Sequence, residues 1–350
     1  MNLSDLLNHT SEWLKGAGAN SDIVISSRVR LARNIDKMPF PHWAGKKQAE
    51  TVIEKARALK ENVDFLKNTS FLGMSELDSV DKQFLVERHL MSHELSQKPN
   101  SKALIVENSE VFSVMVNEED HLRIQVMQSG FNLKGAWDIV NGLDDAISRE
   151  VQYAFSREWG YLTACPTNAG TGMRGSVMLH LPALVMLNQI NRVLAAIAKL
   201  SFTTRGFYGE GTQAAGNFFQ ISNQVSMGQS EEDLVGNIDG LIRQIIEQEA
   251  QAREALVARE KAMLEDRVHR SFGILRNAHI ISSKETIELL SMLRLGCELG
   301  MIGDLNRSVI NELFILIQPA HLQKLENKKL SPEDRDVKRA EIIRGKLNAV

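Results

Sequence analysis

The chain has 350 residues, of which 43% are hydrophobic and 24% charged, and its formal net charge is -3. This is the composition of an ordinary globular protein, and the small net charge gives no general attraction to nucleic acid. No run approaches the roughly 18 apolar residues of a membrane span, and MNLSDLLNHTSEWLKG does not have the pattern of a signal peptide. The two cysteines fit neither a disulfide framework nor a zinc site. We therefore expect a cytoplasmic protein with no direct nucleic-acid or membrane partner.

The first 230 residues predict strands separated by long helices. VFSVMV and LRIQVM flank the charged turn NEEDH, which predicts a hairpin. In chain order, the expected elements are a helix over 5–16, a strand over 21–34, a helix over 46–67, three β-rich runs over 102–130, a helix over 133–158, a strand over 176–181, a helix from Pro182 to about 200 and a strand over 218–224.

The composition changes after Ser230. SEEDL begins a charged helical region with a capping pattern of Ser230 and Asp233. Shorter helices follow, one ending at Gly300 and one beginning at the Ser-Pro pair of SPEDRDVKRA. We therefore predict an α+β domain over 1–250, with antiparallel strands and flanking helices, and an all-helical C-terminal domain over 251–350.

Five arginines stand outside the predicted helices, at strand ends or in loops rich in Gly, Ser and Thr. They are Arg28, Arg30, Arg123, Arg174 and Arg205. The guanidinium fork matches phosphate oxygens and stays charged. If the five converge, they can hold a triphosphate without a P-loop, and such positioning is most of what phosphoryl transfer needs. Each one taken alone fits a solvated surface residue equally well.

Carboxylates and a cysteine lie in the same kinds of segment. Glu119 sits in the NEEDH turn and Glu210 in the loop GFYGEG. They could bind magnesium, or they could orient a guanidinium and take its proton. Cys165 lies in ACPTNAGTGMRGS, where Thr167 and Asn168 could stabilise a thiolate beside a guanidinium. A buried structural cysteine is the alternative.

Four segments of the chain resemble, in their order, the signature loops of the phosphagen (guanidino) kinases. They are SSRVR, NEEDHLR, CPTNAGTGMR and RGFYGEG. The resemblance covers roughly residues 20–250. It implies an antiparallel sheet flanked by helices, and reversible transfer of the γ-phosphoryl group of ATP, with Mg²⁺, to a guanidino nitrogen. No protein ligands for the Mg²⁺ are assigned.

The resemblance also assigns roles. Glu119, Glu210 and Cys165 resemble the catalytic residues that hold and deprotonate the guanidinium. The residues that resemble the nucleotide site are Ser27, Arg28, Val29, Arg30, Leu31, His89, Arg123, Arg174, Gly175, Ser176, Val177, Met178, Arg205, Gly206, Phe207, Tyr208, Gly209 and Glu210. Met178 stands where small-guanidine kinases often have histidine, which leaves the adenine contacts open.

Two departures point to one branch of the family. SSRVR begins so early that no room precedes it for the helical N-terminal domain of small-guanidine kinases, which implies an open guanidine site. The added helical region contains RDVKRA and is similar to that of bacterial protein-arginine kinases. There the stretch implies a phosphoarginine pocket with allosteric influence, here Arg335, Asp336, Arg339 and Ala340. From composition alone, these residues fit a solvated helix face.

That branch implies phosphorylation of exposed arginines in protein substrates. It also implies a stress response, with marking for a Clp ATPase/protease system, control of a heat-shock repressor, a zinc-binding activator protein and a possible homodimer. Two alternatives remain open: a kinase for free arginine or another small guanidine, and a phosphoarginine-reading binding module. A serine/threonine kinase is disfavoured because the sequence lacks HRD, DFG and a glycine-rich loop.

Overall fold

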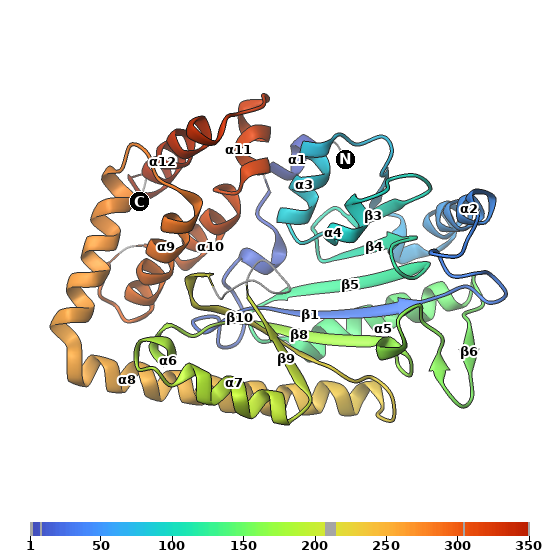
Figure 1. Ribbon diagram of the computed structural model, residues 1–350, viewed down its shortest axis with the longest axis horizontal. Helices are drawn as coiled ribbons and strands as arrows, with labels where there is room; N and C mark the ends of the chain where they lie inside the picture. The colour runs from blue at the N-terminus through green and yellow to red at the C-terminus, as the bar shows by residue number, and fades with distance from the viewer. Residues whose placement is uncertain (1–2, 8, 207–214, 304, 349–350) are drawn as a thin grey trace.

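The computed structural model describes residues 3–7, 9–206, 215–303 and 305–348. Its centre is an eight-stranded sheet in the order β2-β3-β4-β5-β1-β8-β10-β9, in which every neighbouring pair is antiparallel (Figure 1). The strands are β1 (Val24–Arg33), β2 (Thr69–Gly73), β3 (Ala103–Glu107), β4 (Phe112–Val116), β5 (Leu122–Ser129), β8 (Met173–His180), β9 (Phe202–Arg205) and β10 (Phe218–Asn223), with a separate small pair β6 (Phe155–Ser156) and β7 (Gly160–Tyr161).

Helices surround this sheet and fill the C-terminal region. They are α1 (Leu3–Leu7), α2 (Lys46–Asn62), α3 (Ser79–Glu87), α4 (His93–Ser96), α5 (Leu133–Ser148), α6 (Pro182–Met186), α7 (Ile190–Lys199), α8 (Glu231–Asn277), α9 (Ser283–Glu298), α10 (Arg307–Leu316), α11 (Pro319–Glu326) and α12 (Pro332–Asn348), with short 3-10 turns η1 (Glu12–Leu14), η2 (Asp64–Leu66), η3 (Pro166–Asn168) and η4 (Ala215–Asn217). None of these described helices is long and apolar enough to cross a membrane.

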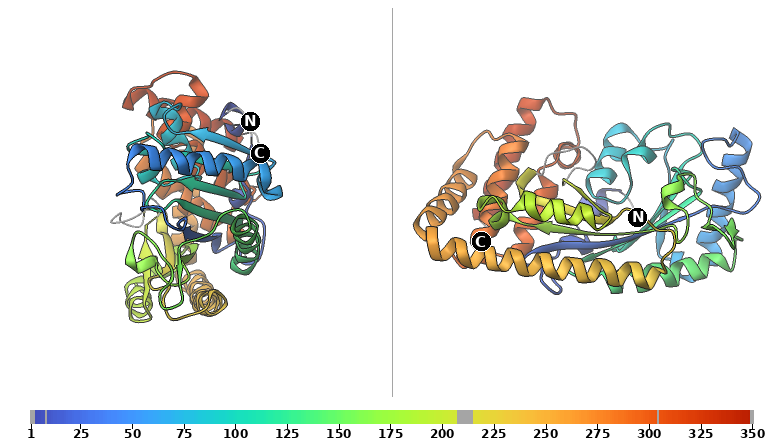
Figure 2. Two further views of the ribbon diagram at one scale, coloured as in Figure 1. Left: turned by 90° about the vertical axis from the view of Figure 1, so that its right-hand side faces the viewer. Right: turned by 60° about the horizontal axis from the view of Figure 1, so that its bottom comes forward.

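The two faces of the sheet differ because side chains alternate along a strand. On β1, Val29 and Leu31 are fully buried and belong to the main apolar core, whereas Arg28 and Arg30 are partly exposed on the other face. Helix α5 and the first part of α8 pack against the sheet (Figure 2), and their buried residues complete that core. The arginines therefore lie on the face turned away from this core, where Arg28 lines a small pocket, and we call this face the arginine cleft.

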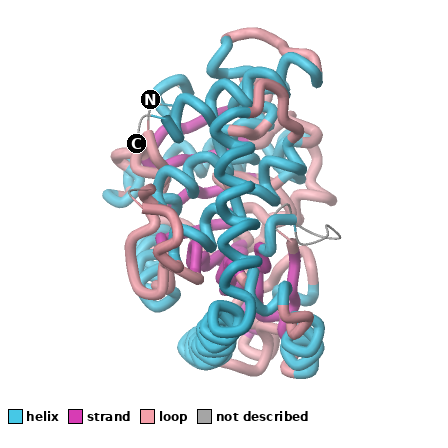
Figure 3. The backbone as a smooth tube through the Cα atoms, turned by 90° about the vertical axis from the view of Figure 1, so that its left-hand side faces the viewer, coloured by secondary structure: helices cyan, strands magenta, loops and turns pink. Residues whose placement is uncertain are grey.

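Helices α9 to α12 gather at one end of the sheet, in front of the strands in Figure 3. Helix α8 runs along the sheet and then turns towards them, and its backbone departs from helical geometry at Glu260. A second, smaller core joins this region to the outer strands, because Ala320 of α11 packs with Phe84 and Leu85 of α3. The C-terminal helices are thus fastened to the sheet domain from two sides.

The strand at 21–34, the hairpin β4–β5 and the helix starts at Ser230 and Ser331 are confirmed. Ser230 and Asp233 form the expected capping box, and the Ser331 hydroxyl accepts the N–H of Asp334. The fold class, an antiparallel sheet flanked by helices with a helical C-terminal region, is confirmed as well. The domain boundary at 250 stays a prediction, and that residue lies inside α8.

Four helix predictions are wrong in extent. The helix over 46–67 ends at Asn62, because Val63 is extended and the short 3-10 turn η2 follows it. The helix over 133–158 ends at Ser148, because 152–154 pairs with the chain after β1: the backbone N–H of Asp36 donates to Gln152 O, and that of Ala154 donates to Asn34 O. The helix from Pro182 divides into α6 and α7 at Asn188, which has a left-handed φ of 57°.

The helix over 5–16 divides into α1 and η1, because Ser11 is buried and bonded to Glu110 and Arg88. Residues 202–205, where the sequence predicted no strand, form edge strand β9 beside β10.

Candidate active site

The register of the sheet brings five arginines to one face. Arg30 of β1 lies directly opposite Arg174 of β8. Arg123 of β5 lies opposite Ala32, two residues beyond Arg30, and Arg205 of β9 lies opposite Gln220 of β10. Residues paired across antiparallel strands share a face. The arginines found in four separate sequence segments therefore form one cluster in the cleft.

Two arginines of the cluster, Arg28 and Arg30, lie in surroundings that disfavour their charged forms. Burial, and next the charges of Arg123, Arg174 and Arg205, lower the pKa of Arg28 to about 9. Burial followed by Arg28 and the other arginines holds the pKa of Arg30 well below its usual range. The Nε of Arg30 is buried and has no hydrogen-bond partner among the described residues. A bound polyanion would satisfy this donor and relieve the mutual repulsion.

Hydrogen bonds to hydroxyl groups fix the orientation of two of the guanidinium groups in the cleft. Arg174 donates from Nη2 to Thr203 Oγ1 (3.0 Å) and Ser222 Oγ (3.1 Å). Arg28 Nε donates to Ser176 Oγ over 3.4 Å. These neutral partners hold the side chains without cancelling their charge. Thr203 and Ser222 could not be found from the sequence, because only the register of β8, β9 and β10 places them on this face.

The three carboxylates of the NEEDH turn differ in burial and in hydrogen-bond partners. Glu118 is buried and forms an ion pair with Arg123, with 2.6 Å between Oε1 and Nη1. Asp120 is buried and accepts from Asn34 Nδ2 (2.6 Å) and the Ala164 N–H (2.7 Å). Glu119, between them, is exposed. The turn is thus anchored by its neighbours, and Glu119 is the carboxylate left to meet a substrate.

The electrostatic surroundings of Glu119 suit a general base. Partial burial, and next the negative charges of Asp120 and Glu118, raise its pKa above the ordinary value. A carboxylate whose pKa is raised takes up a proton more readily.

The cysteine loop lies against this turn. Ala164, which donates to Asp120, directly precedes Cys165. The Cys165 Sγ lies 3.0 Å from Thr167 Oγ1, as the sequence suggested, and it is only partly buried. The structure therefore brings the Cys165 loop and the Glu119 turn to one edge of the arginine cleft.

A small pocket continues from the arginines along β1. Beyond Arg28 its walls are Trp13, Ser26, His89, Met127, Ser176, Met178 and Gln220. Burial, and next Arg28, lower the pKa of His89 to about 3, so its ring is neutral near pH 7. His89 and Met178 were both assigned near a nucleotide, and the structure places them together. Trp13 was missed, because nothing in its sequence context connects it with the strands.

The side chains of several residues assigned to the nucleotide site point away from the arginine cleft. The side chains of Val29, Leu31 and Val177 are fully buried on the opposite face. A Cβ on Gly175 would stand 2.5 Å from Ile238 of α8, and the Ser27 hydroxyl binds the backbone of Gly130 and Asn132.

Strand alternation explains this correction, because every second residue of a strand points away from the cleft. Gly206 ends the described part of its loop, and Phe207, Tyr208, Gly209 and Glu210 lie outside the described residues.

The RDVKRA stretch forms part of α12, as expected, but its arginines are not equivalent. Arg339 is 2% exposed and donates to the carbonyls of Ile317 (3.1 Å) and Ile281 (2.9 Å) and to Asp336. Arg335 is partly exposed and donates to Leu330 O. Ala340 is buried. The guanidinium of Arg339 is therefore engaged with two backbone carbonyls and Asp336, and the phosphoarginine pocket stays a prediction.

Similarity to known proteins agrees with this geometry. The family described as ATP:guanido phosphotransferase, C-terminal catalytic domain, matches residues 50–252, and the Protein-arginine kinase McsB C-terminal domain matches residues 261–350. Protein-arginine kinase from Halothermothrix orenii is 47% identical over 349 residues, which is 99% of this chain and 100% of that protein. Protein-arginine kinase from Bacillus subtilis is 46% identical over 340 residues, 97% of this chain and 93% of that protein.

Among solved structures, lombricine kinase superposes with a TM-score of 0.61 at 24% identity, covering 69% of each chain, which establishes a common fold. The fold, the arginine cleft and these full-length relatives lead to one conclusion. The chain belongs to the ATP:guanido phosphotransferase family and, within it, to the protein-arginine kinases.

Proposed function

We propose that this protein transfers the γ-phosphoryl group of ATP to a guanidino nitrogen of arginine side chains in other proteins. The observation that supports this most directly is the cluster of five arginines on one sheet face, beside an exposed carboxylate, Glu119. The clustered arginines suit a triphosphate, and the carboxylate suits a cationic nucleophile.

Because the pocket lies at one end of the arginine cluster, it supports one orientation of the nucleotide. The phosphates lie over Arg30, Arg174 and Arg205, and the base lies beyond Arg28, between His89 and Met178. In this orientation the γ-phosphate lies at the other end of the cluster, near Arg123. Arg123 forms an ion pair with Glu118, so this end of the cluster lies next to the NEEDH turn. The acceptor guanidinium then meets Glu119 and Cys165 at the edge of the cleft.

The chemistry at that edge is a direct displacement. A guanidino nitrogen forms a bond to the γ-phosphorus as the bond from phosphorus to the bridging oxygen of ADP breaks. Glu119 accepts the proton that the guanidinium loses, and Cys165 helps to hold the guanidinium. Glu210 was assigned as a second carboxylate, but it lies outside the described residues. The arginines stabilise the charge on the transferring group.

Magnesium fits this site as a companion of the nucleotide. The described residues contain no group of three or more His, Cys, Asp or Glu side chains arranged to hold a metal. Mg²⁺ commonly binds through substrate phosphates and water with few protein ligands. We therefore propose that the ATP phosphates provide most of its ligands.

A protein substrate is supported by two observations. Glu119 is exposed, so that an arginine on a large molecule can reach it. Full-length relatives at 46 to 47% identity carry the name protein-arginine kinase. The test is incubation with ATP, Mg²⁺ and an arginine-rich protein, followed by intact-mass analysis and acid treatment.

We expect a mass gain that acid removes, since a phosphoramidate is acid-labile. Glu119→Gln is the control and should give no such gain. A mark that survives strong acid, or equally fast transfer to free arginine, would contradict the proposal.

The wider role remains part of this proposal and is supported by family resemblance. It comprises a cytoplasmic stress response, marking of substrates for a Clp protease, action on a heat-shock repressor, a zinc-binding activator and a homodimer. The α12 pocket would bind the phosphoarginine product. Arg335, which is partly exposed, is its best-placed phosphate ligand, whereas Arg339 would act mainly by holding Asp336.

A further inference from the structure

Two walls of the base pocket come from segments outside the central sheet. Trp13 belongs to η1, and His89 lies two residues after the end of α3. Their rings meet edge to face with centroids 5.2 Å apart. Trp13 is 2% exposed, and its Nε1 is a buried donor with no hydrogen-bond partner among the described residues. A polar atom of a nucleotide would supply the missing acceptor.

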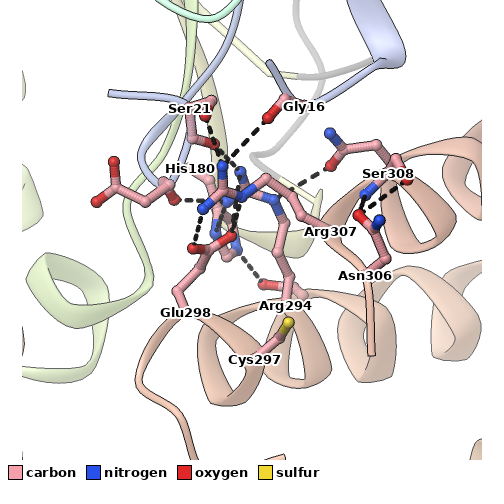
Figure 4. A network of polar contacts seen from close by, with 12 residues as sticks. Gly16, Ser21, His180, Arg294, Cys297, Glu298, Asn306, Arg307 and Ser308 are labelled. Atoms are coloured by element: carbon pink, nitrogen blue, oxygen red, sulfur yellow. Dashed lines mark hydrogen bonds and ion pairs between the residues drawn. The ribbon is translucent and has the colours of Figure 1, made fainter. Parts of the chain in front are cut away.

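The C-terminal helices hold the chain that follows Trp13. Arg294 of α9 is fully buried and donates from Nη2 to Ser21 O (2.6 Å) and from Nη1 to Asp22 O (2.9 Å). Asn311 of α10 donates to Leu14 O over 3.3 Å. Figure 4 shows Arg294 reaching from its helix towards Ser21, with His180 of β8 beside it. These bonds fix the path from Trp13 into β1.

Arg307, at the start of α10, makes a second connection to the same segment. It donates to Gly16 O (3.2 Å) and Ser21 Oγ (2.5 Å), and its other donors grip Glu298 of α9 as a fork (Figure 4). Arg307 is partly exposed, unlike Arg294. It therefore offers a connection that can be cut with less risk to folding.

A separate connection holds the His89 wall. Glu87 lies two residues before His89 and accepts the N–H groups of Ala320 (2.9 Å) and His321 (3.1 Å) at the beginning of α11. It also accepts from His321 Nδ1 over 2.8 Å. A carboxylate at a helix N-terminus is favourable, since it receives free N–H groups. The end of α3 is thereby fixed to α11.

We propose that Trp13 contacts the nucleotide base and that the C-terminal helices set the positions of both walls, with Arg294, Arg307 and Glu87 as positioning residues. This inference rests on the placement of the nucleotide in the proposed function. Two unrelated sets of polar contacts, one from α9 and α10 and one from α11, converge on the two sides of one pocket. The helical region is thus a structural part of the nucleotide site.

Tryptophan fluorescence tests the contact directly. Of the four tryptophans, Trp43 and Trp159 are 76% and 50% exposed, and Trp137 lies on α5 against Glu231, so Trp13 is the one that lines the pocket. We expect ADP to change the emission of the wild-type protein. Trp13→Phe should lose that change and bind ADP roughly fivefold more weakly, since it loses one hydrogen bond. An ADP-induced change that survives in Trp13→Phe would overturn the contact.

The positioning role is tested with Arg307→Ala and Glu87→Gln. Each should raise the Kd and KM for nucleotide roughly fivefold, with little change in kcat or in the KM for protein substrate. Arg307→Lys should recover part of the loss. Arg243→Ala, which removes an exposed ion pair with Asp239 on α8, is the matched control. A lower Tm with an unchanged Kd for ADP, measured by equilibrium dialysis, would show that these contacts serve folding alone.

These outcomes are distinct from a failure of the proposed function. If the protein binds ADP through Trp13 but transfers nothing to arginine, the pocket inference stands and the reaction is wrong. If transfer occurs and Trp13→Phe binds ADP normally, the reaction stands and the inference is wrong.

Discussion

Arginines gather both in the cleft of the sheet and among the C-terminal helices, but their surroundings differ. Arg28 in the cleft and Arg294 on α9 each have a pKa lowered to about 9, with burial as the largest cause in both. The next causes for Arg28 are three other arginines. For Arg294 the next causes are Glu298, which raises the pKa, and Arg253 and Arg307, which lower it. Unlike Arg28, Arg294 also donates to Ser21 O, Asp22 O and Asn311 Oδ1. A lowered pKa alone therefore does not distinguish a binding arginine from a structural one, whereas the partners do.

Removing a cleft arginine should have the largest effect on activity. We expect Arg28→Ala to reduce phosphoryl transfer about 10³–10⁵-fold and to weaken ADP binding. It should not lower the Tm, because at neutral pH the lowered folded pKa means that the charged side chain is less favourable in the folded protein. Transfer assays and thermal unfolding check this. A large fall in Tm would show that Arg28, like Arg294, has a structural role.

Glu119→Gln should separate catalysis from binding within the cleft. We expect a loss of about 10²–10⁴-fold in kcat with an almost unchanged Kd for ADP, because the proposed function assigns Glu119 to the acceptor guanidinium and Arg28 to the nucleotide. Single-turnover transfer and ADP titration measure the two quantities. Parallel loss of ADP affinity would show that Glu119 supports magnesium or the hairpin instead.

The acid side of the pH profile should report the same carboxylate. Burial, and next Asp120 and Glu118, raise the pKa of Glu119, and the deprotonated form is the base. The kcat/KM should therefore fall about tenfold per pH unit below a midpoint higher than the ordinary value near 4.3. Profiles of wild type and Glu119→Gln are compared, and an identical acid side in both would assign it to another group.

Substituting the arginines of α12 should have the smallest effects on activity. The two substitutions should instead differ in their effect on the free energy of unfolding. Arg339→Ala leaves the carbonyls of Ile281 and Ile317 without their donor and should lower the free energy of unfolding by about 1–3 kcal/mol. Arg335→Ala should hardly change it, yet should weaken phosphoarginine binding. Denaturant titration and calorimetry measure both, and normal phosphoarginine binding by Arg335→Ala would refute its place in the pocket.

Elements whose formation depends on nearby residues, and the family, could be predicted from the sequence. The alternation over 21–34, the NEEDH turn and the hydroxyl caps at Ser230 and Ser331 depend on neighbours only a few residues away, and all three appear as expected. The four loop motifs were long enough to indicate a guanidino kinase, which the relatives confirm.

Which residues share a face, and which arginines are engaged, depends on contacts between distant parts of the chain. The register of β1 against β5 and β8 places Arg123 and Arg174 beside Arg30, and such pairing joins residues more than ninety positions apart. The same distant contacts end a helix at Ser148, place Trp13 against His89 and bury Arg339 against Ile281 and Ile317. Local propensity carries no information about such partners, because the free energy that selects them comes from packing and hydrogen bonds formed when the whole chain folds.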